Sequence, residues 1–235
     1  MQVTTYHRLN VYDYIDRFCG YDAIEELLKY CTPAIYENFF LAMFKTGGRV
    51  NEALPLFSDN FFVDKEQDCL VVSDMTLEKR YRKDKDTGET FKVNAVRKPF
   101  PILLEERLTP ELIEFVQSKN GMLFPSPYKG RVKPISRVRV YQVIREVTDD
   151  LPPKLFKELG LNKPFKDRYG NQIDDKIHLW NHWFRSQRAS SLKATYGFTE
   201  GDLMEWFQWL DFKTATHYAH LGYSGLAAKM VKNKT

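Results

Sequence analysis

The sequence predicts an α+β fold that is mostly helical and contains one small three-stranded antiparallel sheet. Apolar residues recur at helical spacing from about 22 to 45, on both sides of Pro33, and helical segments are expected again at 136–150 and 179–196. Between about 60 and 104 the pattern changes to short β-rich runs separated by turn residues. Together these segments predict a single α+β domain.

Each expected element in the N-terminal half begins or ends at a turn signal. Pro33 separates two helices, and the tight turn at 45–49 precedes a short helix over 50–54. Residues 86–88 (Asp-Thr-Gly) are expected at the tip of a long, lysine-rich hairpin. The expected strands are 61–63, 69–72 and 93–102.

After the hairpin the chain is expected to return to helix. Thr109 is predicted to cap a helix that has Pro110 at its first position and that ends at Gly121. Ser136 is predicted to cap the next helix, which runs to about Asp150.

The C-terminal third combines a polar loop with further helices. Residues 160–177 contain several glycines, asparagines and prolines and are expected to form the loop. Residues 199–202 (Thr-Glu-Gly-Asp) resemble a capping box for the helix after 179–196. Two short helices are expected to follow, the first of them containing Tyr218.

Composition places the chain among globular proteins with an internal core. Its 235 residues are 43% hydrophobic and 14% aromatic, which excludes intrinsic disorder. A net charge of +4 permits a polyanionic partner without requiring one. No apolar run is long enough for a membrane span, so a soluble protein is expected. The three cysteines form no C-x-x-C pair, which argues against a disulfide scaffold and indicates a reducing compartment: Cys19, Cys31 and Cys69.

Three side chains suit the chemistry of a phosphodiester, whose transition state concentrates negative charge on the non-bridging oxygens. Arginine is always charged and can hold two oxygens at once. Arg49 follows a turn that contains Gly47 and Gly48. Arg185 lies three residues after His182, so both are expected on one helix face at a shared site.

Two motifs in this set resemble those of the tyrosine recombinase (phage integrase) family. Residues 46–54 (TGGRVNEAL) resemble its T-G-x-R turn, which is followed by an acidic residue three positions on. Residues 182–185 (HWFR) resemble its H-x-x-R motif. The family's fold, a mostly helical catalytic domain with a small antiparallel sheet, is therefore the expected one.

Two further matches follow in the family's order. Residues 207–212 (FQWLDF) occupy the place of the family's L-G-H/W segment, with Trp209 where most members have histidine. Tyr218 comes nine residues after Trp209, within residues 216–220 (THYAH), which resemble the family's tyrosine-then-histidine ending. Each motif alone also fits an ordinary packing or surface residue, so the resemblance depends on the ordered set.

The resemblance implies a role for each of these side chains. Tyr218 would attack the scissile phosphorus and form a 3′-phosphotyrosyl intermediate. Arg49 and Arg185 would hold the non-bridging oxygens. His182 would assist proton transfer, and the indole N–H of Trp209 would donate to the phosphate.

The resemblance also implies a supporting acid and a catalytic lysine. Glu52 would orient the site from behind the groups that touch the phosphate. The family supplies its general-acid lysine from a β-hairpin, and Lys92 is the first choice because it lies just ahead of a strand like the family's third. Lys79 is a close second, and Lys83 and Lys85 stay open.

Double-stranded DNA is the expected partner, bound by a homo-oligomer, a tetramer on DNA. No metal and no other cofactor is expected, because the phosphotyrosine retains the bond energy. The protein is expected to be associated with DNA in the cytoplasm of a cell that hosts a mobile element or virus. Basic residues expected to contact the DNA backbone lie in the hairpin and before residue 140: Lys79, Arg80, Lys129, Arg131, Lys133, Arg137 and Arg139.

Alternative functions share parts of this pattern. A topoisomerase IB-like or telomere-resolving enzyme would use the same chemistry on other substrates. A non-catalytic DNA-binding protein would have little reason to retain Arg49, His182, Arg185 and Tyr218 together. Zinc binding is disfavoured because His178 and His182, although spaced i, i+4, lack the glutamate of H-E-x-x-H.

The sequence also departs from the family's pattern. We expect an N-terminal extension over 1–21 and the catalytic domain over 22–235, without the helical core-binding domain that precedes it in most members. Gly48 replaces the usual apolar residue, and this second glycine is expected to loosen the Arg49 turn. Residues 151–176 are expected to be an insertion.

Overall fold

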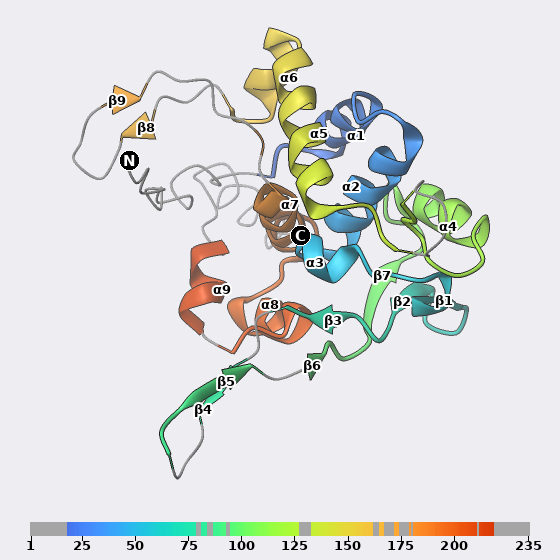
Figure 1. Ribbon diagram of the computed structural model, residues 1–235, viewed down its shortest axis with the longest axis vertical. Helices are drawn as coiled ribbons and strands as arrows, with labels where there is room; N and C mark the ends of the chain where they lie inside the picture. The colour runs from blue at the N-terminus through green and yellow to red at the C-terminus, as the bar shows by residue number, and fades with distance from the viewer. Residues whose placement is uncertain are drawn as a thin grey trace, which may run out of the picture.

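Helices dominate the structure, a computed structural model in which a small antiparallel sheet lies at one side (Figure 1). It describes residues 18–78, 81–83, 87–92, 95–126, 133–161, 165–166, 172–173, 179, 181–210 and 212–218. The helices are α1 (Tyr21–Lys29), α2 (Ala34–Thr46), α3 (Val50–Ala53), α4 (Thr109–Gln117), α5 (Arg137–Asp150), α6 (Pro153–Glu158), α7 (Asn181–Tyr196), α8 (Glu200–Phe207) and α9 (Phe212–Tyr218). The predicted fold class is confirmed.

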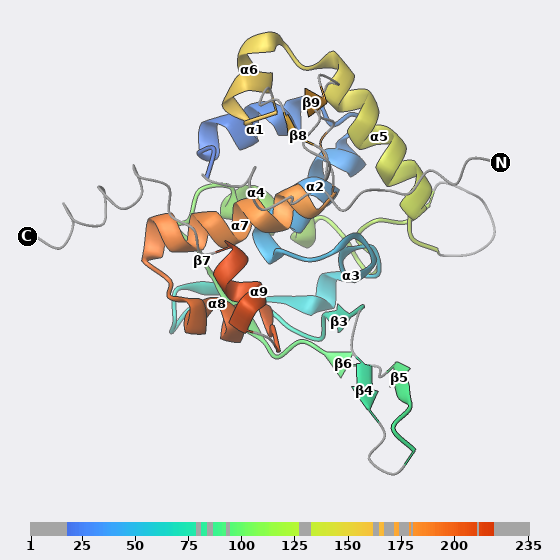
Figure 2. The ribbon, with the colours of Figure 1, turned by 90° about the vertical axis from the view of Figure 1, so that its left-hand side faces the viewer.

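The core is built around α2 and α7, which pack against each other (Figure 2). Every residue of α2 from Phe39 to its end is buried, because helices or loops cover it on all sides. Phe40 stacks on Phe184 of α7 with ring centroids 5.0 Å apart. This helix pair fixes the position of the turn after α2 relative to the middle of α7.

The three-stranded sheet has the order β1-β2-β7 and is antiparallel throughout. Its strands are β1 (Phe61–Asp64), β2 (Cys69–Val72) and β7 (Phe100–Leu103). The expected strand over 93–102 is divided: β6 (Ala95–Val96) pairs with β3 (Thr76–Leu77), and β7 begins only at Phe100. Pro99 has no N–H to donate to a ladder, and Arg97 turns its side chain into the core, so the strand is interrupted between them.

The predicted long hairpin is confirmed. Strand β4 (Tyr81–Lys83) pairs with β5 (Thr90–Lys92), so residues 84–89 connect them. Both views show this arm projecting away from the body of the molecule (Figures 1 and 2).

Two of the predicted helix caps are confirmed and one is wrong. The Ser136 Oγ accepts a hydrogen bond from the Arg139 N–H at 3.1 Å, and Thr199 forms a capping box with Asp202. In α4 the residue before the helix is Leu108, which has a positive φ, and Thr109 is already helical. The helix also ends at Gln117, before Gly121, since Ser118 and Lys119 close it with turn hydrogen bonds.

The C-terminal half contains elements that the sequence pattern did not indicate. Within the expected loop, β8 (Phe165–Lys166) pairs with β9 (Gln172–Ile173). Before that loop, α6 packs against α1. The helix expected after Tyr218 lies outside the described residues. Among the described helices, none is long and apolar enough to cross a membrane.

A buried ionic cluster joins α2, α7 and the loop between β7 and α4. The Glu106 carboxylate accepts hydrogen bonds from Lys45 Nζ at 2.7 Å, from the Tyr21 hydroxyl at 2.9 Å and from both terminal nitrogens of Arg188. Burial alone would raise the pKa of Glu106, but Arg188 and Lys45 lower it to about 2. Burial, together with Arg188, lowers the pKa of Lys45 to about 7.

Candidate phosphodiester site

The turn that ends α2 places Arg49 at the start of α3. Gly47 adopts a left-handed conformation with φ 58°, and its N–H donates to the Phe44 carbonyl at 3.2 Å. A Cβ at position 47 would lie 2.4 Å from Cε1 of Phe207. Glycine is therefore required twice, once for the backbone and once for the close approach of α8.

The second glycine of the turn does not loosen it, contrary to the expectation. A Cβ at Gly48 would lie 2.2 Å from the Cε methyl of Met75. The space of the missing side chain is thus filled from the segment before β3. The Gly48 N–H also donates to Thr46 Oγ1 at 3.2 Å, which fixes the turn from inside.

Replacing Gly47 with alanine is expected to lower the unfolding free energy by about 2–4 kcal/mol, from left-handed strain plus overpacking. Gly197→Ala is the matched control, since Gly197 also has a positive φ but no atom within 4 Å of the position that a Cβ would take. This control should cost about 1–2 kcal/mol, the strain alone. Chemical denaturation measures both, and equal losses would contradict the proposed close packing of Gly47 on α8.

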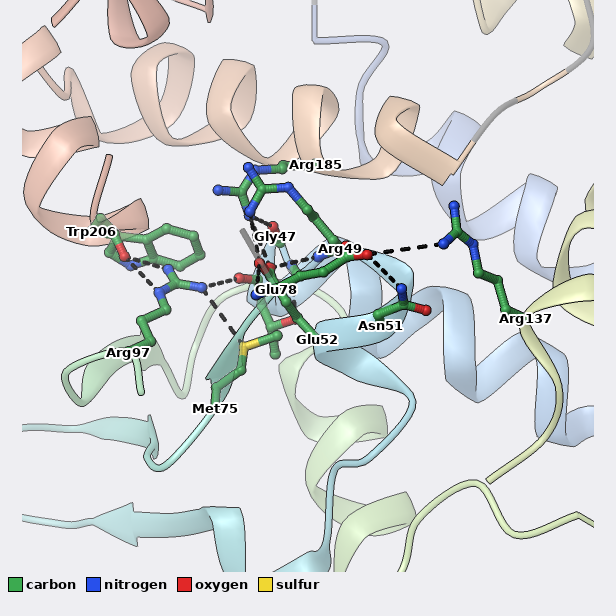
Figure 3. Close-up of polar contacts among 12 residues, drawn as sticks. Gly47, Arg49, Asn51, Glu52, Met75, Glu78, Arg97, Arg137, Arg185 and Trp206 are labelled. Carbon is green, nitrogen blue, oxygen red and sulfur yellow. Dashed lines mark hydrogen bonds and ion pairs between the residues drawn. The ribbon is translucent and has the colours of Figure 1, made fainter. Parts of the chain in front are cut away.

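Glu52 lies at the centre of the site, with a side chain that is 1% exposed (Figure 3). Its carboxylate accepts from the Arg49 N–H at 2.8 Å, from Arg49 Nη1 at 2.7 Å and from the Glu78 N–H at 3.2 Å. Nη1 of Arg185 is 3.5 Å from Oε2. Burial would raise the pKa of Glu52, but Arg185 and Arg49 outweigh it and lower the pKa, so the carboxylate stays ionised. Glu52 thus orients both arginines.

Arg185 reaches the turn from α7 and is almost completely buried. It donates from Nη1 to the Gly47 carbonyl, and its guanidinium carbon is 4.7 Å from the ring centroid of Phe207. Trp209 stacks on Phe207 with centroids 4.4 Å apart, and the Arg185 guanidinium lies 5.5 Å from its ring. Aromatic faces on one side and Glu52 on the other therefore hold this arginine in place.

Arg97 is a buried arginine of the site that none of the sequence motifs identified. It is 2% exposed and donates to the Thr46 carbonyl at 2.7 Å and, from Nε, to the Trp206 carbonyl at 2.9 Å. Its guanidinium carbon lies 3.5 Å from the ring centroid of Phe100. Burial and the nearby Arg185 lower the pKa of Arg97 well below its usual value. Arg97 ties the Arg49 turn to the end of α8.

In front of this cluster is a pocket to which α3, α5 and α7 contribute. Its lining includes Arg49 and His182, so the structure brings together two of the predicted catalytic side chains. Arg185 and Trp209 are not among its lining residues and pack behind it. The pocket is lined by Arg49, Val50, Asn51, Glu78, Arg137, Tyr141, Asn181 and His182.

An acidic residue, Glu78, shares this pocket with the basic ones. Its Oε1 accepts from Asn51 Nδ2 at 2.5 Å and lies 3.9 Å from Nη1 of Arg137, as the dashed lines in Figure 3 show. Arg137 also donates to the Tyr141 hydroxyl at 3.2 Å. No sequence motif pointed to Glu78.

The structure describes only some of the remaining predicted site residues. Arg139 is half-buried and pairs with Glu146 at 2.8 Å on the same helix, and Lys133 is exposed. Lys92 pairs with Tyr81 in the arm, but the side chains of Lys92 and Lys83 are outside the described atoms. Lys79, Arg80, Lys85, Lys129, Arg131, His178 and His220 lie outside the described residues.

Tyr218 is the last residue of α9, a helix that packs against α8 and α7. Its backbone is described and its side chain is not. The helix that carries Arg185 and the segment that carries Trp209 therefore adjoin the helix that carries Tyr218. Within the part of the chain that the structure describes, no group of three or more His, Cys, Asp and Glu residues could hold a metal ion.

No protein-family model and no curated protein sequence matches the chain. Solved structures do: XerA recombinase superimposes with a TM-score of 0.53 at 18% sequence identity, over 92% of this chain and 63% of that chain. XerH site-specific recombinase, bound to palindromic difH substrate in a post-cleavage complex, superimposes with a TM-score of 0.51 at 15% identity, over 95% of this chain and 55% of that one.

The chain has the tyrosine recombinase fold. It spans less than two thirds of the length of either recombinase. In this fold, the sequence motifs of the turn at 46–49 and of α7 meet around Glu52.

Proposed function

We propose that this protein cleaves and rejoins DNA strands at specific sites, as a tyrosine recombinase or integrase that acts through Tyr218. The observation that carries the proposal is the pairing of Arg49 and Arg185 on the buried Glu52, beside a pocket that also contains His182. Two fixed guanidinium groups held by one carboxylate suit a doubly anionic transition state at phosphorus.

The proposed reaction balances without an added cofactor. The Tyr218 oxygen bonds to phosphorus while the bond to the 5′-oxygen breaks, which leaves a 3′-phosphotyrosyl link and a free 5′-hydroxyl. His182 accepts the phenolic proton of Tyr218, and a hairpin lysine, Lys92 ahead of Lys79, donates a proton to the departing 5′-oxygen. Rejoining reverses these steps, because the phosphotyrosine retains the energy of the bond.

The supporting groups have distinct tasks in this scheme. Arg49 faces the pocket with a side chain that is 23% exposed, so it contacts the phosphate first. Arg185 is 2% exposed and adds its charge from behind, with Trp209 packed on it. Arg137 lies at the far wall of the pocket, where it suits the DNA backbone next to the reacting phosphate. Cleavage at two sites on two duplexes would require a tetramer.

A covalent trap tests the proposal without knowledge of the target site. The protein is incubated with nicked duplexes of randomised sequence, so that cleavage next to the nick releases a short strand and prevents rejoining. We expect protein–DNA adducts that survive denaturation, and none with Tyr218→Phe. Adducts that persist in Tyr218→Phe would contradict the nucleophile, and DNA binding with no adduct from any sequence would favour a binding-only protein.

The carboxylate in the pocket leads to a separate prediction on affinity. Glu78→Gln keeps the oxygen that Asn51 binds but removes a negative charge beside Arg137. We expect duplex DNA to bind about 3- to 10-fold more tightly at low salt, with a smaller gain at high salt. Fluorescence anisotropy measures it. The control is Glu66→Gln, an equal charge change at an exposed turn, and an equal gain there would show that only net charge matters.

A further inference from the structure

Asn181, the first residue of α7, is a buried amide that makes no hydrogen bond to the residues that the structure describes. The side chain is 4% exposed, and neither Nδ2 nor Oδ1 has a partner among them. Rotating the amide by 180°, which exchanges the positions of Nδ2 and Oδ1, still leaves the NH₂ group without an acceptor among the described residues. A buried polar group in this state is costly, and native proteins tolerate few of them without a functional reason.

The position of this amide indicates what it binds. Asn181 lines the same pocket as Arg49 and His182. Nε of Arg49 is a second buried donor for which the described residues provide no partner. The pocket also lies at the N-terminus of a 16-residue helix, whose first N–H groups favour an anion. The Asn181 amide, Arg49 Nε and the first N–H groups of α7 would therefore be satisfied by an anionic group that accepts hydrogen bonds.

The acid in the pocket does not satisfy the amide. Glu78 bonds to Asn51 and lies near Arg137, and Asn181 has no partner beside it in the described part of the chain. An occupant that brings its own acceptor oxygens between Arg49 and the start of α7 would satisfy both of these donors at once.

We propose that Asn181 is a further phosphate-binding residue, whose Nδ2 donates a hydrogen bond to a non-bridging oxygen of the DNA phosphodiester held by Arg49 and His182. This rests on the proposed function and adds a residue that none of the recombinase motifs identified. A phosphodiester has no donor, so only the Nδ2 of the amide is assigned to it.

The direct test is a titration followed by nuclear magnetic resonance. Tyr218→Phe protein, which keeps the DNA uncleaved, is labelled with ¹⁵N and titrated with a short mixed-sequence duplex. The Asn181 NH₂ signal is identified by its absence in an added Asn181→Leu substitution. We expect this signal to shift on saturation and to return as salt displaces the DNA. An unmoved Asn181 signal at saturation overturns the proposal, whether or not the Arg49 Nε–H signal moves.

Asn181→Leu provides a second test, because function and stability should change in opposite directions. Removing an unsatisfied buried amide is expected to raise the midpoint of thermal unfolding by about 2–4 °C. Adduct formation should slow by about 10- to 100-fold, the value of a hydrogen bond to a charged oxygen. If Asn181→Leu instead lowers the midpoint and leaves the adduct rate unchanged, the amide is structural and the proposal fails. Asn181→Ala repeats the comparison should the leucine variant not fold.

The matched control is another asparagine that already has a partner. Asn60 accepts a hydrogen bond from the Phe57 N–H at 2.7 Å and does not line the pocket. Asn60→Leu should lower the unfolding midpoint and leave the adduct rate unchanged. These experiments distinguish failure of the proposed function from failure of the Asn181 proposal. If the proposed function is wrong, the unaltered protein forms no adduct, but the resonance shift and the stability gain still test whether Asn181 binds the phosphate.

Discussion

Arg185→Ala is expected to slow the formation of covalent protein–DNA adducts by about 10²- to 10³-fold, while DNA affinity falls only a few-fold. The guanidinium is held between Glu52, the Gly47 carbonyl and the ring of Phe207, so it is fixed before DNA arrives. A charge fixed in this way stabilises the transition state more than the bound substrate. Single-turnover cleavage and anisotropy, measured on the same duplexes, separate the two effects.

Because Arg185 is buried, the same substitution also affects folding, and this calls for a matched control. Arg188 lies one turn further along α7, is equally buried and pairs with Glu106 away from the pocket. Arg188→Met should therefore lower stability without slowing cleavage per folded molecule. If Arg188→Met slows cleavage as much as Arg185→Ala, or if Arg185→Ala loses binding and cleavage equally, the role assigned to Arg185 is wrong.

Glu106→Gln is expected to cause the largest loss of stability, about 3–5 kcal/mol of unfolding free energy. The substitution leaves Lys45 and Arg188 buried side by side without their shared carboxylate. Glu105→Gln is the control, since Glu105 is exposed and its loss should change the free energy by less than about 0.5 kcal/mol. Similar losses in the two variants would contradict the structural role of the cluster.

The pH dependence of stability provides an independent check on this cluster. The pKa of Glu106 is about 2 in the folded protein, below its ordinary value of 4.5. The stability that the carboxylate contributes is therefore present above pH 4.5 and is lost as the pH falls toward 2. Urea denaturation between these values should show a steeper loss for the unaltered protein than for Glu106→Gln. Parallel slopes would show that Glu106 is not held ionised by its partners.

The part of the site that lies close together in the sequence was predicted through the motif that residues 46–54 share with the recombinase family. Glu52 lies three residues after Arg49, and its contact with Arg49 at the start of α3 is local. The Ser136 cap, the Thr199 capping box and the hairpin are equally local. In each of these cases the residue types restrict the backbone itself.

The residues that were missed depend on contacts across the fold. Arg97 resembles its basic neighbours in the hairpin, and only its contacts with Thr46 and Trp206 identify it as a core residue. Glu106 lies in a polar turn, where nothing in the sequence indicates that Lys45 and Arg188 will bury it. Asn181 precedes a recognised motif but belongs to none. Its significance depends on having no partner among the described residues, which only the fold can reveal.

The sequence also predicted one shared site for His182 and Arg185, and the structure refines that arrangement. His182 is exposed in the pocket, whereas Arg185 points into the protein toward Glu52 and the turn at 46–49. A one-turn separation on α7 thus distributes the pair between the surface that meets DNA and the layer behind it.

Mapping the covalent link tests the central proposal most directly. Adducts recovered from the randomised nicked duplexes would be digested with protease and nuclease, and the nucleotide-bearing peptide sequenced by mass spectrometry. We expect the nucleotide on the peptide that contains Tyr218, attached through its 3′-phosphate, with a free 5′-hydroxyl on the released strand. A link to another residue, or attachment through a 5′-phosphate, would contradict the account.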